Sequence, residues 1–272
     1  MQFISRYVSH QPDPQGFVSY SEEENGVWQT LYERQMAILP HRACEQYIEG
    51  LAKLELTASQ IPQLPHLSKR LSALTGWQVV PVAALITAEE FFSLLAKRCF
   101  PAATFIRHRE ELDYVQEPDI FHEVFGHCPL LTNPVYANFV CDYAKIVLTF
   151  PKEDWSLLQR LFWFTVEFGL IKTKAGVRAY GGGILSSNSE TVYSVESDIP
   201  LRVLFNPVTV LRTPYRIDQL QVIYFVIDDY EALYKIKKQD MVKYLARARA
   251  LGEFPPFFDI EKLTPSIHIH AC

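Results

Sequence analysis

Two histidines five residues apart carry the most informative chemistry in this sequence. His122 and His127 lie in PDIFHEVFGHCP, where Pro118 and Asp119 are typical of the first turn of a short helix. In an unbroken α-helix, a spacing of five separates two side chains by roughly 140° around the axis. A helix that ends at Gly126, with this glycine in the left-handed conformation, would return His127 to the side of His122. We therefore expect both imidazoles to bind one metal ion.

Glu167 is the candidate for a third ligand. It is the one charged residue in the apolar run LFWFTVEFGLI, where a bare carboxylate would be expensive to bury. Two neutral imidazoles and one carboxylate form a facial set that leaves coordination positions open on ferrous iron for dioxygen activation. The residues alone also allow a plainer interpretation, in which the histidines are an ordinary core or surface pair and Glu167 is paired with an arginine.

Two other classes of metal site compete with this interpretation. Zinc proteases with the HExxH motif place the histidines four apart on one helical face, whereas HEVFGH places them five apart. One rival is a zinc hydrolase that uses the same three ligands, with Glu123 as its general base. The second is a non-catalytic binding domain with a structural metal. A structural zinc normally has four ligands, and Cys128, directly after His127, cannot easily reach around to be the fourth.

The elements that must position these residues are mainly helical. Ser21 with Glu24 and Thr87 with Glu90 form the pattern of a capping box, which marks the start of a helix. Apolar residues then recur at helical spacing. The expected helices are 21–39, 41–56, 66–74, 87–100, 133–150, 153–171 and 228–251. Residues 77–82 and 103–108 are expected to be extended, and the glycine-rich segment 177–187 to be a turn between extended pieces.

The pattern as a whole predicts a mostly α protein, with a single catalytic domain of helices and a few short β-strands. A chain of 272 residues with 49% hydrophobic residues can fill one sizeable core. Pro12, Pro14 and Gly16 interrupt the start of the chain. Residues 1–20 are therefore expected to form an irregular arm, and residues 21–272 the catalytic iron-binding domain.

Composition excludes several classes of partner. A net charge of -5 without a lysine- and arginine-rich run argues against nucleic acid. No apolar run reaches the roughly 18 residues that a membrane span needs, and no signal peptide pattern opens the chain, so we expect no membrane association and a cytoplasmic protein. The scattered cysteines have no CxxC pair and are expected to be reduced thiols. They are Cys44, Cys99, Cys128, Cys141 and Cys272.

Three blocks in order along the chain carry a family resemblance: EPDIFHEVFGHCPLL, LFWFTVEFGL and AYGGGILSSNSE. Together they resemble the catalytic domain of the pterin-dependent aromatic amino acid hydroxylases, most of all the bacterial members that act on phenylalanine. The similarity extends from about Leu74 to Phe254 and implies the aromatic amino acid hydroxylase fold. We expect neither the N-terminal regulatory domain nor the C-terminal oligomerisation helix of the animal members.

The resemblance implies a ferrous iron and a tetrahydropterin co-substrate, either tetrahydrobiopterin or a related compound. The implied iron ligands are His122, His127 and Glu167. Phe91 would stack on the pterin ring, with Leu85 and Glu123 beside it, and Glu123 would also belong to the catalytic group. Plain core packing of Phe91 and a solvated Glu123 are the alternatives. Ala84 departs from the family pattern, which usually has glycine at this position.

Substrate contacts are implied for a second set of residues. Arg107 would bind the carboxylate of the amino acid in bidentate fashion. Asp119 and Ser186 would orient the histidines, a role that metal-bound imidazoles usually need filled. The residues implied to line the substrate pocket are Pro118, Trp163, Phe168, Gly183, Ser186 and Ser187.

The resemblance also bears on which ring is hydroxylated. Tyrosine hydroxylases resemble one another by an acidic residue at the position that is Ile217 here, and Trp163 keeps the bulk suited to an unsubstituted ring. An apolar wall gives a phenolic hydroxyl no partner. We expect conversion of L-phenylalanine to L-tyrosine with dioxygen and tetrahydropterin, by a monomer or small homo-oligomer.

Overall fold

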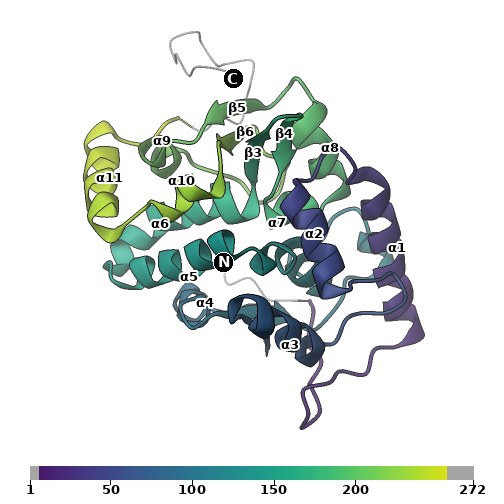
Figure 1. Ribbon diagram of the computed structural model, residues 1–272. Coiled ribbons are helices and arrows are strands. Elements are labelled where there is room, and N and C mark those ends of the chain that lie inside the picture. The colour runs from purple at the N-terminus through teal and green to yellow at the C-terminus, as the bar shows by residue number, and fades with distance from the viewer. Residues whose placement is uncertain (1–5, 256–272) are drawn as a thin grey trace.

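The computed structural model describes residues 6–255 of the chain. Helices account for most of the regular structure in this part of the chain, as the sequence predicts (Figure 1). The α-helices are α1 (Glu22–Ile38), α2 (Glu45–Leu54), α3 (Leu64–Thr75), α4 (Ala88–Leu95), α5 (Pro134–Leu148), α6 (Trp155–Phe162), α7 (Gly182–Leu185), α8 (Asn188–Glu196), α9 (Pro207–Arg212), α10 (Tyr230–Tyr234) and α11 (Lys238–Leu251). Short 3-10 helices are η1 (Arg109–Glu111), η3 (Leu130–Thr132) and η4 (Lys152–Asp154), and π-helices are η2 (Phe121–His127) and η5 (Trp163–Glu167).

The strands form two small sheets. They are β1 (Gln78–Val82), β2 (Cys99–Ala103), β3 (Gly169–Thr173), β4 (Gly176–Ala179), β5 (Leu201–Leu204) and β6 (Ile223–Ile227). β1 and β2 pair in parallel. The other sheet has the order β4-β3-β6-β5, in which only the β3–β4 pair is antiparallel (Figure 1). Every residue of β6 is buried, as expected for an inner strand.

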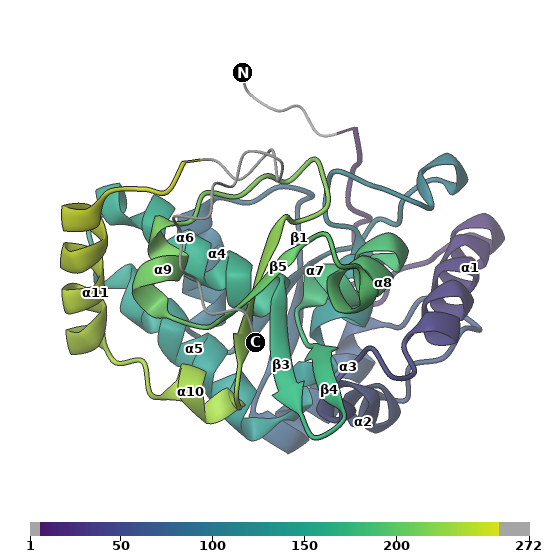
Figure 2. The ribbon, with the colours of Figure 1, turned by 90° about the horizontal axis from the view of Figure 1, so that it is seen from above.

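Helix α5 contacts α3, α4 and α10. In both ribbon views α1 and α11 lie at opposite ends of the molecule (Figures 1 and 2). One large cluster of buried apolar side chains connects these elements, and its largest members include Trp28, Trp77 and Tyr47. The ligand-bearing segments η2 and η5 lie inside this cluster, so the packing of the whole molecule holds the candidate site in place.

Local sequence signals locate several helix ends correctly. Ser21 and Glu24 form a reciprocal capping box at the start of α1. The hydroxyl of Thr87 accepts a hydrogen bond from the backbone N–H of Glu90 at the start of α4. α3 ends at Gly76, which has a φ angle of 76°. These signals act within three or four residues and depend little on the rest of the fold.

Other predicted boundaries are wrong because tertiary contacts override local pattern. The helix expected over 153–171 ends at Glu167, and the following residues form β3 between two neighbouring strands. The helix expected over 228–251 breaks between α10 and α11, where Ile236 is buried against the core. The strands β5 and β6 were not expected at all. Of the extended piece expected over 103–108, only Ala103 lies in a strand, at the end of β2, and residues 104–108 form neither helix nor strand.

The glycine-rich segment was also predicted incorrectly. Within 177–187 the chain forms β4 and then the short helix α7, where a turn between extended pieces was expected. This helix packs against η2 and η5, which carry the candidate ligands.

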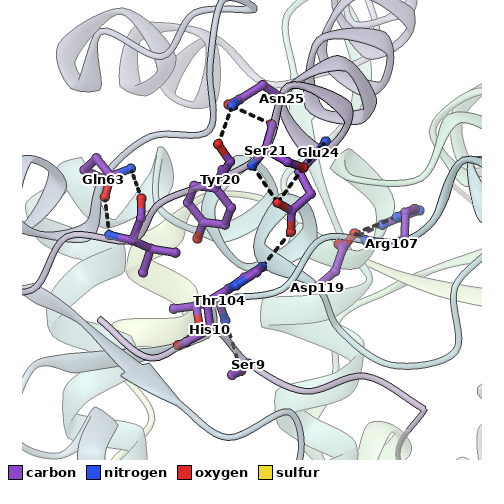
Figure 3. A network of polar contacts seen from close by, with 11 residues as sticks. Ser9, His10, Tyr20, Ser21, Glu24, Asn25, Gln63, Thr104, Arg107 and Asp119 are labelled. Atoms are coloured by element: carbon purple, nitrogen blue, oxygen red, sulfur yellow. Dashed lines mark hydrogen bonds and ion pairs between the residues drawn. The ribbon is translucent and has the colours of Figure 1, made fainter. Parts of the chain in front are cut away.

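The described part of the N-terminal arm, residues 6–20, has no helix or strand. The hydroxyl of Ser9 accepts a hydrogen bond from the backbone N–H of Thr104 at 3.2 Å, and His10 Nε2 lies 2.6 Å from a carboxylate oxygen of Glu24 (Figure 3). The ring of Tyr7 stacks on Phe105 with a centroid separation of 4.4 Å. The arm therefore lies along the segment that leads from β2 to Arg107.

Further expectations from the sequence concern the cysteines, the domain division and membrane spans. Cys44, Cys99, Cys128 and Cys141 are free thiols, whereas Cys272 lies outside the described residues. The division into an arm and a catalytic domain stays a prediction, and its residues 1–5 and 256–272 also lie outside. Within the described part of the chain, no helix combines the length and apolar character needed to cross a membrane.

Candidate active site

A π-helix brings the two histidines together. Residues 121–127 form η2, in which backbone hydrogen bonds join residues five apart, so side chains at that spacing approach one face. The Nε2 atoms of His122 and His127 lie 3.2 Å from each other. The proposed helix end at Gly126 is wrong, because this glycine lies inside η2 and has no positive φ angle. The shared face is predicted correctly, but the backbone geometry that creates it is different.

Glu167 reaches the same point from the second π-helix, η5, which continues directly from α6. Its Oε2 atom lies 3.3 Å from Nε2 of His127 and 3.6 Å from Nε2 of His122. The backbone N–H of Phe168 donates to the carbonyl of Trp163 at 2.8 Å, which closes the wide turn that carries Glu167. Two segments about 40 residues apart in the chain thus converge on one point.

The hydrogen bonds around His122 determine which of its ring nitrogens carries the proton. Ser186 Oγ lies 2.9 Å from Nδ1 of His122 and donates its one proton to the carbonyl of Gly182 at 2.8 Å. The hydroxyl must therefore accept from Nδ1–H, and Nε2 of His122 is left as an unprotonated lone pair. That lone pair faces the Nε2 atom of His127 and a carboxylate oxygen. Such a donor set fits a divalent cation with open coordination positions, and it matches the set expected for ferrous iron.

The electrostatics of the ligands agree with this assignment. Burial lowers the pKa of His122 to about 4, so its imidazole is neutral near pH 7. Burial alone would raise the pKa of Glu167, but attraction to His127, a hydrogen bond from His127 and attraction to His122 together lower it. The site therefore combines the neutral imidazole of His122 with an ionised carboxylate.

A second carboxylate, Glu123, lies close to the same point. A ring nitrogen of His122, a ring nitrogen of His127 and a carboxylate oxygen of Glu123 all lie within 4.8 Å of one another. Burial, and then the charges of Glu167 and Asp119, raise the pKa of Glu123 well above its usual value. Glu167 is the better third ligand, because its carboxylate is ionised and its Oε2 lies within 3.6 Å of both Nε2 atoms.

The hydrogen bonds of Asp119 reach the backbone of His122 and the side chain of Arg107, and none goes to an imidazole ring. It accepts hydrogen bonds from Nε of Arg107 at 2.7 Å and from Nη2 at 2.9 Å (Figure 3). It also accepts from the backbone N–H of His122 at 3.0 Å. Asp119 thus orients His122 through the backbone. Burial disfavours the charged forms of Arg107 and Asp119. Their ion pair outweighs this effect, so the pKa of Arg107 is raised, the pKa of Asp119 is lowered, and both remain charged.

The same ion pair limits which edge of Arg107 is available. Its Nε–Nη2 edge is engaged by Asp119, so the expected bidentate contact with a substrate carboxylate would have to use the Nη1–Nη2 edge. Nη1 lies outside that pairing, and Arg107 lines a cavity beside the candidate metal ligands. A carboxylate can therefore be bound only through the remaining N–H groups of the guanidinium.

Two cavities meet at the convergence point. The larger has a volume of about 550 Å³, and its lining includes His122 and Glu167. Every residue implied as a substrate contact lines it: Arg107, Pro118, Trp163, Phe168, Gly183, Ser186 and Ser187. The smaller, of about 310 Å³, is lined by Leu85, Phe91 and Glu123, the residues implied on the pterin side. Pro118, Trp163 and Glu167 line both cavities and therefore form the boundary between them.

Phe91 occupies a position that allows both interpretations made from the sequence. Its ring packs edge-on against Phe92 and Phe162, with centroid separations of 5.5 and 5.3 Å. It is also only partly buried and lines the smaller cavity. Stacking of Phe91 on a pterin stays a prediction.

Glycine allows α7 to approach the ligands closely. A Cβ atom added to Gly182 would lie 2.4 Å from the ring of His127, and one added to Gly126 would lie 2.6 Å from the carbonyl of Gly182. Neither contact is possible without a shift of backbone or ring. These two glycines therefore let α7 and η2 pack together with the His127 ring between them.

Several polar residues of the larger cavity were not singled out from the sequence. Glu190 accepts hydrogen bonds from the hydroxyl of Tyr224 and from the backbone N–H of Gln221. The pattern Ser187 to Glu190 is that of a capping box, and Ser187 does accept from the N–H of Glu190. That signal predicts the start of α8, but not that the Glu190 side chain faces the core.

The fold and this site define the class of protein. Residues 3–261 match the family described as biopterin-dependent aromatic amino acid hydroxylase, and the chain belongs to this family. The chain is 52% identical to phenylalanine-4-hydroxylase of Pseudomonas aeruginosa, over 93% of this chain and 97% of that protein.

Solved structures give the same result. The chain resembles the phenylalanine hydroxylase of Legionella pneumophila with a TM-score of 0.91 and 67% identity, over 93% of this chain and 100% of that one. It resembles the Chromobacterium violaceum enzyme, in a structure with bound oxidised Fe(III), with a TM-score of 0.84 and 41% identity, over 90% and 91% of the two chains.

Proposed function

We propose that this protein is a phenylalanine 4-monooxygenase, which converts L-phenylalanine to L-tyrosine with dioxygen and a tetrahydropterin at one ferrous iron. The observation that carries the proposal is the position of the His122, His127 and Glu167 donor atoms at the boundary of two cavities. A reaction that joins an amino acid, a pterin and dioxygen needs one reactive centre open to two bound molecules. The relatives named as phenylalanine hydroxylases, one of them with bound Fe(III), support the same reaction.

The larger cavity suits an aromatic amino acid. Trp163 and Phe168 provide apolar ring surfaces, and Arg107 provides a positive charge whose position is set by the buried ion pair with Asp119. In our proposal the phenylalanine carboxylate binds the N–H groups of Arg107 that Asp119 does not use. The ring then lies against Trp163, next to the metal ligands.

The smaller cavity suits a tetrahydropterin. In our proposal Phe91 stacks on the pterin ring, while Leu85 and the carboxyl of Glu123 contact its edges. Leu85 is half exposed, which leaves it accessible to a bound molecule. Glu123 is nearly inaccessible to bulk water, so its hydrogen bonds to a bound pterin would be made in an apolar environment.

Ferrous iron held by His122, His127 and Glu167 supplies the chemistry of dioxygen activation when it is bound. The other residues position the reactants. Ser186 holds the tautomer of His122, Asp119 orients its backbone, and the packing of α7 against His127 prevents that ring from turning. The apolar walls exclude water around the reacting groups once both molecules are bound.

The proposal has one direct test. Protein loaded with ferrous iron should consume dioxygen and form tyrosine when phenylalanine and tetrahydrobiopterin are both present, and it should form none without iron or without the pterin. A protein that holds zinc, consumes no dioxygen and hydrolyses amide or ester substrates would support the rival hydrolase. In that case Glu123 would be its base.

Binding partners are assigned only by chemical class. The family implies small-molecule substrates and a pterin. A monomer or small homo-oligomer, the absence of a nucleic acid partner and a cytoplasmic location stay predictions from the sequence.

A further inference from the structure

The indole of Trp163 lies in the wall between the two cavities. It stacks on Tyr215, with ring centroids 4.2 Å apart and an interplanar angle of 13°, and packs against Phe168 at 4.5 Å and 34°. Stacking determines the plane of an indole, but a half-turn about χ2 leaves the ring in the same plane and exchanges its two edges. A further contact is therefore needed to fix which edge of the ring faces each cavity.

The side-chain amide of Gln221 makes that contact. Its Oε1 accepts a hydrogen bond from Nε1 of Trp163 at 3.1 Å. Its Nε2 donates to the carbonyls of Arg216 at 2.8 Å and Gln219 at 3.3 Å. Gln221 is 5% exposed, so these bonds are shielded from water. One amide thus ties the indole to the loop 214–222, several residues of which line the larger cavity.

The backbone of Gln221 is held separately from its side chain. Its N–H donates to Glu190 at 3.0 Å, and Glu190 also accepts from the hydroxyl of Tyr224 in β6. This arrangement anchors Gln221 to the sheet and to α8. The amide is therefore a fixed reference point for Trp163.

Trp163 also begins the π-helix that ends at Glu167, and its carbonyl accepts the hydrogen bond that closes that turn. An error in the position of the indole would change the wall of both cavities and disturb the turn that carries a metal ligand. The orientation of the Trp163 indole therefore affects the binding sites of both molecules, and the hydrogen bond to Gln221 fixes that orientation.

We propose that Gln221 is a positioning residue for the hydroxylation, which acts by fixing the orientation of the Trp163 indole between the amino acid and the pterin. This inference rests on the proposed function. Without the amide, the phenylalanine ring would bind in less defined positions. More of the tetrahydropterin would then pass two electrons and two protons to dioxygen, to give hydrogen peroxide and dihydropterin without hydroxylating the ring.

The test variant is Gln221→Leu, which keeps the size of the side chain and removes the amide. We expect the KM for phenylalanine to rise about five- to tenfold, and the ratio of tyrosine formed to tetrahydropterin oxidised to fall at least twofold. Gln63→Leu is the matched control. Gln63 also bonds two backbone groups, the N–H and carbonyl of Val18, but it lines neither cavity, so the loss of its amide should lower Tm alone.

Trp163→Phe tests the mechanism, because it removes the N–H donor and keeps an aromatic ring beside Tyr215. If Gln221 acts through Trp163, Gln221→Leu should have little further effect on KM or coupling in the Trp163→Phe background. Additive effects of the two changes would overturn the inference. The signal of the Trp163 indole N–H in a ¹⁵N NMR spectrum should also shift and exchange faster with solvent in Gln221→Leu than in Gln63→Leu.

The inference and the proposed function fail in different ways. A wild-type protein that forms no tyrosine would refute the proposed function. Unchanged KM, coupling and indole signal in a folded Gln221→Leu protein would refute the role of Gln221.

Discussion

Each of the three candidate ligands supplies one donor atom to the point where His122, His127 and Glu167 converge. We expect His122→Ala, His127→Ala and Glu167→Ala each to abolish tyrosine formation, because a two-ligand site cannot retain ferrous iron. Iron content after gel filtration and the rate of tyrosine formation measure this. Circular dichroism should show a retained fold. Wild-type activity in any one of the three, after removal of added metal, would show that the ligand set is wrong.

Phe91 tests the pterin side of the site. Phe91→Ala should raise the KM for tetrahydropterin about fivefold, since a lost aromatic stack costs on the order of 1 kcal/mol beyond area. The KM for phenylalanine should change much less, because Phe91 lines only the smaller of the two cavities. Steady-state kinetics with each substrate varied in turn distinguishes the two. Equal increases in the two KM values would indicate that Phe91 instead contributes to core packing, through its contacts with Phe92 and Phe162.

The choice of ring is also decided by single residues. Ile217 lines the larger cavity and offers a phenol no side-chain partner, and Trp163 limits its width. We expect a higher kcat/KM for L-phenylalanine than for L-tyrosine, by about tenfold or more, since an unpaired hydroxyl costs roughly 1 to 3 kcal/mol. Competition between the two amino acids in one assay measures the ratio. Preferential formation of dihydroxyphenylalanine would overturn this assignment and leave the metal site intact.

At the scale of elements, the site depends on how closely α7 packs on the π-helix η2. Gly182→Ala would place a Cβ 2.4 Å from the ring of His127, so the ring or the helix must move. We expect at least a tenfold loss of iron affinity and a destabilisation of about 1 to 3 kcal/mol. Iron titration and thermal unfolding measure the two effects.

Gly26→Ala is the matched control for that experiment. Gly26 lies inside α1, and a Cβ there would meet a flexible arginine nitrogen at 3.4 Å, which is tolerable. Alanine should stabilise this helix by about 0.5 to 1 kcal/mol and leave iron binding unchanged. If both variants bind iron like the wild type, close packing at Gly182 is not required.

At the scale of the whole molecule, stability should depend on pH through Glu190. Burial raises the pKa of this carboxyl to about 7, although hydrogen bonds from Tyr224 and from the N–H of Gln221 oppose the shift. The folded state therefore holds the proton more tightly than the unfolded state. The stability that results is fully present below about pH 4.5 and is lost as the pH rises through about 7.

Glu190→Gln removes this dependence and keeps an oxygen that can accept both hydrogen bonds. The free energy of unfolding of the variant minus that of the wild type should increase between pH 5 and pH 8, on the order of 2 kcal/mol. Urea unfolding of both proteins at each pH gives this difference, in which other titrating groups cancel. A constant difference across the range would show that Glu190 is not protonated in the folded protein.

Much of the chemistry of this protein can be read directly from its sequence. The ligand residues, the caps at Ser21 and Thr87 and the helix end at Gly76 depend on residue type and short spacing. Such signals arise from hydrogen bonds and backbone preferences within a few residues, so they do not require knowledge of the fold. The three family blocks carry the same kind of information, because they specify which donors, rings and glycines stand in which order.

Only the tertiary structure decides how these residues meet. The spacing of five in HEVFGH fits one face only because η2 is a π-helix. The π-helix in turn packs with α7 through glycines that lie more than 50 residues apart in the chain. The pairing of Arg107 with Asp119, the lowered pKa of Glu167 beside the raised pKa of Glu123, and the hydrogen bond from Trp163 to Gln221 also depend on distant contacts. Burial and long-range packing set their energies, and neither can be obtained from local sequence pattern.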